Sequence, residues 1–67
     1  MNNGYVRDCR ASGISDRIID AVREYMTSET NYSLGYYLGV KSVAPPSDVD
    51  AYGSDAVTAY RIWQYYN

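Results

Sequence analysis

The sequence predicts an all-α protein, a small bundle of three to four short helices. Three observations carry this prediction: an amphipathic pattern over residues 15–26, a second one over residues 55–66, and a Ser-Asp pair just ahead of three candidate helices. The 67 residues suffice for one small domain, residues 1–67, near the lower limit at which a single core needs no staples.

The first predicted element is a short helix over residues 3–12. Tyr5, Val6 and Cys9 share one face of it, and Gly13 is placed to end it in a left-handed conformation. The chain has one cysteine and no histidine, which excludes an internal disulfide and the common zinc-ligand patterns. We therefore expect Cys9 to be a small buried apolar residue rather than a nucleophile.

The central predicted element is a helix with Ser15 as its N-cap that ends between Met26 and Thr30. Its apolar residues recur at the spacing of one helix face, and they are Ile18, Ile19, Val22, Tyr25 and Met26. Its charged residues fall on the opposite face, and they are Asp16, Arg17, Asp20, Arg23 and Glu24. Such an apolar stripe must be covered by another element of the fold.

Residues 31–40 are ambiguous between a short helix and a strand. Leu34 and Leu38 stand four apart and Gly39 is suited to end a helix, so we predict a helix. The aromatic content and two glycines also suit a strand, but no second strand pattern is available to pair with it. Gly35 inside a helix costs about 1 kcal/mol relative to Ala, so we expect it to let another backbone come close.

The second half of the chain begins with a connector over residues 41–46, which the proline pair stiffens. A single helical turn is predicted from Ser47 to Tyr52, with Gly53 as its stop. The last helix is predicted from Asp55 to about Tyr66.

One side of this last helix gathers apolar and aromatic residues, namely Ala56, Ala59, Ile62, Trp63 and Tyr66. The small side chains of Ala56 and Ala59 allow close approach to the central helix. We expect Trp63 to be the main anchor of the core, packed against Ile18, Ile19 or Val22.

Charge and hydropathy restrict the partners. A net charge of −2, with acids and bases mixed in the first half, argues against a general phosphate-binding surface. No apolar run approaches the length of a membrane span, and residues 1–4 lack the layout of a signal peptide. We therefore expect a cytoplasmic protein with no membrane partner.

The aromatic inventory is unusual, with nine tyrosines, one tryptophan and no phenylalanine. Every aromatic ring thus carries a polar group, which suits positions that are packed at one end and wet at the other. Two interpretations stay open: the tyrosines form a protein interface, or they fill the half-buried positions of a very small fold.

The sequence carries no catalytic motif. Asp16 with Asp20, and Asp48 with Asp50, are carboxylate pairs by spacing, but helix-surface and capping positions explain both. There is also no Gly-rich phosphate loop, since neither Gly35 nor Gly39 is followed by Lys and Ser or Thr. We expect no enzymatic activity, no cofactor and no metal site.

Residues 31–51 resemble a helix-turn-helix, with Leu38-Gly39-Val40 as the turn between two short helices. This resemblance implies a DNA-binding regulator. The prolines would fall inside or just before its recognition helix, and Asp48 and Asp50 would stand where DNA readers carry Arg, Lys, Asn or Gln. We therefore expect such a fold to be used against protein, with no nucleic-acid partner.

The resulting expectation is a non-enzymatic protein-binding module. In size and tyrosine content the chain is similar in style to small inhibitors that phages and mobile elements direct against host enzymes or defence complexes. The alternatives are the helix-turn-helix-like DNA-binding regulator and a self-associating structural or assembly protein, such as a homodimer. The predicted contact residues are the tyrosines off the apolar stripes, with two aspartates orienting a basic partner: Tyr36, Tyr37, Tyr52, Tyr65, Asp48 and Asp50.

Overall fold

The computed structural model describes residues 3–29, 32–39 and 49–67. These residues form four α-helices and one 3-10 helix and contain no strand: α1 (Asn3–Ala11), α2 (Asp16–Thr27), α3 (Leu34–Tyr37), η1 (Val49–Tyr52) and α4 (Ser54–Tyr66). The predicted all-α fold class is confirmed, and the ambiguous segment contains a helix. The predicted connector and the start of the helical turn at Ser47 lie outside the described residues.

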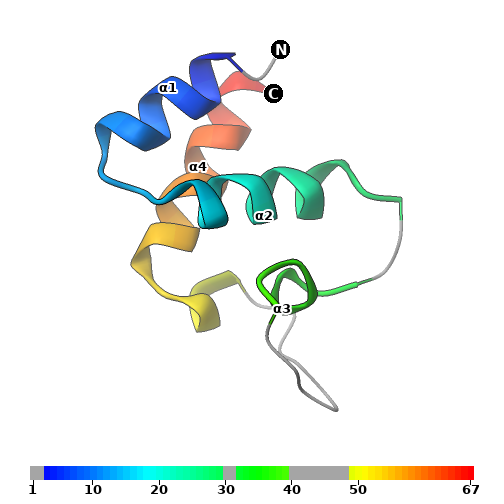
Figure 1. The fold of residues 1–67 in the computed structure, drawn as a ribbon. Helices are drawn as coiled ribbons and strands as arrows, with labels where there is room; N and C mark the ends of the chain where they lie inside the picture. Colours follow the sequence, from blue (N-terminus) through cyan, green and yellow to red (C-terminus); the bar gives the residue numbers. More distant parts are fainter. Residues whose placement is uncertain (1–2, 30–31, 40–48) are drawn as a thin grey trace.

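Helices α2 and α4 pack against each other and against most of the other elements. Helix α4 also contacts α1 and η1, and α2 also contacts α1 and α3. Figure 1 shows α2 crossing α4, with α1 on one side of the crossing and α3 on the other. The two predicted amphipathic helices, α2 and α4, therefore pack against each other, and α1, α3 and η1 pack around this pair.

The core lies where α1, α2 and α4 meet, and α3 contributes buried residues to it as well. Its buried apolar residues are Tyr5, Cys9, Ile14, Ile19, Ala21, Val22, Leu34, Leu38, Ala56, Ala59 and Trp63. The predicted burial of Cys9, Ala56, Ala59 and Trp63 is confirmed. Trp63 belongs to the same buried cluster as Ile19 and Val22, whereas Ile18 is only half-buried against it.

Tyr5 is the largest fully buried side chain, and it supplies an aromatic ring to the core of a protein that has no phenylalanine. Its hydroxyl donates a hydrogen bond of 2.7 Å to the backbone carbonyl of Ile19 in α2. Its ring meets Trp63 of α4 edge to face, with centroids 5.2 Å apart and planes at 85°. One tyrosine thus joins three helices, and burial raises the pKa of its phenol well above the usual value.

Helix α1 ends as predicted, at a left-handed glycine. Gly13 has φ of 79° and donates to the carbonyl of Arg10, while Ile14 donates to that of Cys9. This pair of hydrogen bonds is a Schellman motif. The motif buries Ile14 next to the start of α2, at Ser15.

Two of the three Ser-Asp pairs lie in the described residues, and both stand at helix starts. Ser15 is the N-cap of α2 as predicted, although its side chain makes no capping hydrogen bond, and the N-cap of α4 is Gly53. The aspartates explain the pattern better, because Asp16 and Asp55 lie in first turns, where the helix dipole favours negative charge. Helix α2 ends at Thr27, within the predicted interval.

Gly35 makes room for a side chain rather than for another backbone, which corrects the prediction. A Cβ atom at Gly35 would lie 2.8 Å from the hydroxyl oxygen of Tyr52 and 3.0 Å from its Cε1. The Tyr52 ring of η1 therefore packs directly on α3. Helix α3 ends at Tyr37, and two residues later Gly39 has a left-handed φ of 76°, as predicted.

The two ends of the described chain are joined by a small network, which we call the terminal clasp. The Tyr66 hydroxyl donates to the carboxylate of Asp8, and Arg7 donates to the Tyr66 oxygen at 3.1 Å. A Cβ at Gly4 would lie 2.6 Å from Cε1 of Tyr66, so any larger residue at this position would displace the Tyr66 ring. The hydrogen bond from Tyr66, with help from Arg7, holds the pKa of Asp8 below its usual value.

Candidate interaction surface

Three aromatic side chains of the described residues are more than half exposed. They are Tyr32, Tyr36 and Tyr65, at 52%, 57% and 82%. Large exposed rings mark recognition sites when they gather into a patch rather than standing singly. The question is therefore which of these rings lie together.

Tyr32, Tyr36 and Tyr37 form one group, which we call the tyrosine cluster. The rings of Tyr32 and Tyr36 stack with centroids 4.1 Å apart and planes at 19°. Tyr37 meets Tyr36 edge to face at 5.2 Å and 88°, and it is half-buried. Both are favoured aromatic geometries, so the rings stabilise one another's positions in the cluster.

The position of α3 explains why these rings face water. Leu34 and Leu38 are buried and hold α3 against α2 and η1. A guanidinium hydrogen bond from Arg17 of α2 to the Leu38 carbonyl fixes the end of α3. With the leucines turned inward, Tyr36 points outward. Tyr32 lies two residues before α3 begins, and its ring stacks on that of Tyr36.

The six predicted contact residues do not form one surface. Tyr36 and Tyr37 lie together, and Tyr52 packs beside them on Gly35 with its ring half-buried. Tyr65 is the last residue but one of α4, and its ring contacts Tyr66. Figure 1 shows this end of α4 next to the start of α1 and away from α3. Asp50 is exposed on η1. Asp48 lies outside the described residues.

Tyr32 is the contact candidate that the sequence did not single out. It stands before α3, outside both apolar stripes, so helix periodicity gave no reason to choose it. Because Tyr32 lies outside α3, the rule that residues four apart share a helix face does not apply to it, and its stacking on Tyr36 is visible only in the structure.

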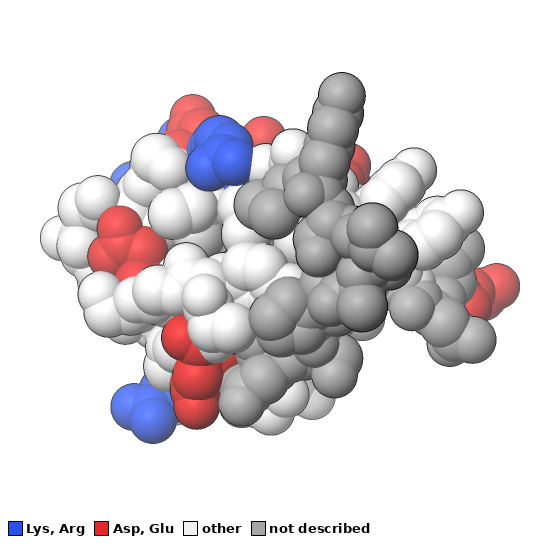
Figure 2. All heavy atoms as spheres, turned by 90° about the horizontal axis from the view of Figure 1, so that it is seen from below, with Lys and Arg blue, Asp and Glu red and all other residues white. Residues whose placement is uncertain are grey.

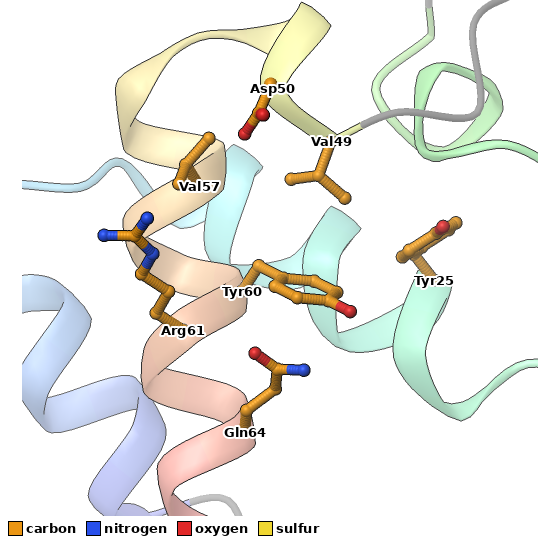
Figure 3. A pocket seen from close by; sticks show the side chains of 7 residues that line it. All are labelled: Tyr25, Val49, Asp50, Val57, Tyr60, Arg61 and Gln64. Carbon is orange, nitrogen blue, oxygen red and sulfur yellow. The ribbon is translucent and has the colours of Figure 1, made fainter.

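A second feature is a hollow of about 370 Å³ between α2, η1 and α4. Its lining residues are Tyr25 from α2, Val49 and Asp50 from η1, and Val57, Tyr60, Arg61 and Gln64 from α4. Figure 3 shows the η1 residues above the hollow, Tyr25 at one side and the residues of α4 opposite. The lining is mixed, with apolar side chains, two phenols, an amide and two opposite charges.

Two further features were sought in the described part of the chain, a metal-binding group and a membrane-spanning helix. It holds no group of three or more potential metal-ligating side chains, and none of its helices is long and apolar enough to cross a membrane. On the face shown in Figure 2, the acidic and basic side chains of the described residues are scattered rather than gathered into one basic area.

Compared with protein-family models, curated proteins and solved structures, the chain shows no match. Its candidate sites therefore have to be judged on their own geometry and chemistry.

Proposed function

We propose that the chain is a non-enzymatic protein-binding module that recognises a partner protein through the tyrosine cluster. The stacked, more than half-exposed pair of Tyr32 and Tyr36 carries the proposal. Tyrosine rings supply large contact areas with few rotatable bonds and a hydroxyl for hydrogen bonding. Because the rings already hold each other in place, less side-chain freedom is lost on binding.

Protein is favoured over nucleic acid as the partner. Stacked aromatic rings also suit unpaired bases, but such sites combine them with a positively charged groove along the backbone. Around α3, the nearest described arginine, Arg17, already donates to the Leu38 carbonyl. The scattered charges of Figure 2 supply no such groove on the face that it shows.

Within this class, the finer proposal is an inhibitor of the kind that phages and mobile elements direct against a host enzyme or defence complex. It would act in the cytoplasm, where a buried thiol such as Cys9 stays reduced. The exposed carboxylate of Asp50 supports a partner with basic groups near the contact. The test of this finer proposal is to add the chain to its partner in a one-to-one ratio and to measure whether the partner's activity is blocked.

Site-specific crosslinking tests the binding proposal. Tyr36 is replaced by the photo-crosslinking residue p-benzoylphenylalanine, and Tyr65 is replaced in the same way as a matched control that is also exposed but lies outside the cluster. In cells that contain the partner, position 36 should crosslink to one protein in high yield and position 65 should not. Tyr36→Ala should abolish capture of that protein and leave the circular dichroism spectrum unchanged.

The same experiment separates the alternatives. A product of twice the chain mass from position 36 would favour the self-associating structural or assembly protein, such as a homodimer. A nuclease-sensitive product would favour the DNA-binding regulator. Crosslinking from position 65 alone would overturn the assignment of the tyrosine cluster as the contact surface.

A further inference from the structure

The stacked pair of the tyrosine cluster leaves one ring face open to a partner. Tyr32 stacks on Tyr36 with centroids 4.1 Å apart, so one face of the Tyr32 ring is covered. Because 52% of Tyr32 is nonetheless exposed, its other face lies in water. The face of a tyrosine ring carries the negative part of the ring quadrupole and attracts a cation placed over it. The open face of Tyr32 therefore favours a positively charged group.

The charges of the described residues beside this ring are negative as well. Glu29 is exposed and precedes Tyr32 by three residues, so the two Cα atoms are at most about 11 Å apart. Helix α2 ends at Thr27 without a basic residue in its last turn, which leaves the negative end of its dipole uncompensated. On the face shown in Figure 2, the described side chains at this end of the molecule, on the right in Figures 1 and 2, include an acidic one and no basic one.

The arginines of α2 do not neutralise the carboxylate of Glu29. Arg23 pairs with Asp20 at 2.6 Å, and Arg17 donates to the Leu38 carbonyl. Glu29 itself makes no hydrogen bond or ion pair with another residue of the described chain. Its carboxylate is therefore available to a group from outside the molecule.

Arginine suits this combination of ring and carboxylate better than lysine does. The guanidinium is planar, stacks on an aromatic face, and can donate two parallel hydrogen bonds to a carboxylate at its edge. The ammonium of lysine is more strongly hydrated and offers no planar surface for stacking. The charge and the shape of the site thus select the same side chain.

We propose that the outer face of Tyr32 and the carboxylate of Glu29 receive an arginine side chain of the partner protein. The guanidinium stacks on the ring and donates to the carboxylate, while Tyr36 supports the ring from its other side. This inference rests on the proposed function, because it names the group that the tyrosine cluster recognises.

The test starts with a library of random peptides, displayed on yeast and selected for binding to the full chain. Peptides are retained when Tyr36→Ala abolishes their binding, since these bind through the tyrosine cluster. We expect the retained peptides to share an arginine. In a synthetic copy of the tightest one, replacing this arginine by its neutral isostere citrulline should weaken binding about tenfold, and lysine should weaken it about threefold.

Variants of the chain assign the effect to the two groups. Glu29→Gln should weaken binding of the arginine peptide about tenfold, but that of the citrulline peptide less than twofold, because only the first pairs with the carboxylate. Glu24→Gln is the matched control, with an effect of less than about twofold, since Glu24 is also exposed but lies five residues earlier, inside α2. Tyr32→Phe keeps the ring face and should keep the affinity, whereas Tyr32→Leu should lower it about tenfold. All these positions are exposed, so the circular dichroism spectrum should not change.

The outcomes separate a failure of this inference from a failure of the proposed function. If no selected peptide depends on Tyr36, the tyrosine cluster is not a contact surface, and both proposals are overturned. If the retained peptides share no arginine, or bind equally well with lysine in its place, only the arginine site is overturned. An equal loss of affinity in Glu29→Gln and Glu24→Gln would also overturn it, because overall charge rather than Glu29 would then determine binding.

Discussion

Removing one oxygen atom from the core, by Tyr5→Phe, separates the two tasks of the largest buried side chain. The variant keeps the ring against Trp63 and loses the hydrogen bond of 2.7 Å to the Ile19 carbonyl. Since Ile19 lies inside α2, that carbonyl keeps its helical partner and is not left unsatisfied. The expected loss is therefore that of an ordinary buried hydrogen bond, about 1 kcal/mol.

Tyr5→Ala provides the comparison, because it removes the ring as well. Deleting a buried aromatic ring costs about 3–5 kcal/mol, which is most of the stability of a domain of this size. Urea unfolding followed by far-ultraviolet circular dichroism measures both variants. In thermal unfolding, Tyr5→Phe should lower Tm by roughly 4–8 °C.

Two outcomes would refute this reasoning. If Tyr5→Phe is as stable as the wild type, the hydroxyl contributes nothing and tyrosine is present at this position for another reason. If Tyr5→Phe is as damaging as Tyr5→Ala, the ring is not the main contribution. An unchanged denaturant dependence between wild type and Tyr5→Phe is required for the comparison.

Three further predictions concern stability. Trp63→Ala should cost about 3–5 kcal/mol, and the wild-type protein should show the blue-shifted fluorescence of a buried indole. Because the folded state raises the pKa of Tyr5 above 10.0, the stability from its neutral phenol is fully present below that pH and is lost as pH rises above it. Gly35→Ala should destabilise the wild type by displacing Tyr52, but should stabilise the Tyr52→Ala variant by up to about 1 kcal/mol, the helix-propensity gain.

Each of these has an outcome that contradicts it. Emission typical of exposed indole would place Trp63 outside the core. An alkaline transition of equal steepness in the wild type and in Tyr5→Phe would remove Tyr5 as its cause. An equal effect of Gly35→Ala in the presence and absence of the Tyr52 ring would show that the two residues are not coupled.

The sequence predicted the fold best where periodicity is strong. The apolar stripe of α2 and the small-residue face of α4 identified both helices and their mutual packing, since apolar side chains that repeat every 3.6 residues indicate an amphipathic helix. Gly13 and Gly39 were predicted correctly from local structure as well, because a left-handed helix end favours glycine over other residues.

The details that sequence did not predict depend on contacts between distant residues. The Tyr52 ring reaches Gly35 across 17 positions of the chain, so no local pattern shows that a side chain fills the space. In the sequence, Ile14 is a loop residue between two predicted helices. In the structure, the Schellman motif at the end of α1 directs its side chain into the core. The candidate contact surface could not be predicted for the same reason. The sequence does not show which tyrosines lie together, because the distance of the tyrosine cluster from Tyr65 depends on where α3 packs in the fold.

The terminal clasp has a consequence for the order of unfolding. The first and last helices are bound to each other by Tyr5 with Trp63 and by Asp8 with Tyr66, so neither is a free end. Most domains fray from their termini, but here α1 cannot detach without exposing the core face of α4. We expect amide hydrogen exchange in α1 and α4 to be slow and to share one opening free energy, which makes this small protein unfold as a single cooperative unit.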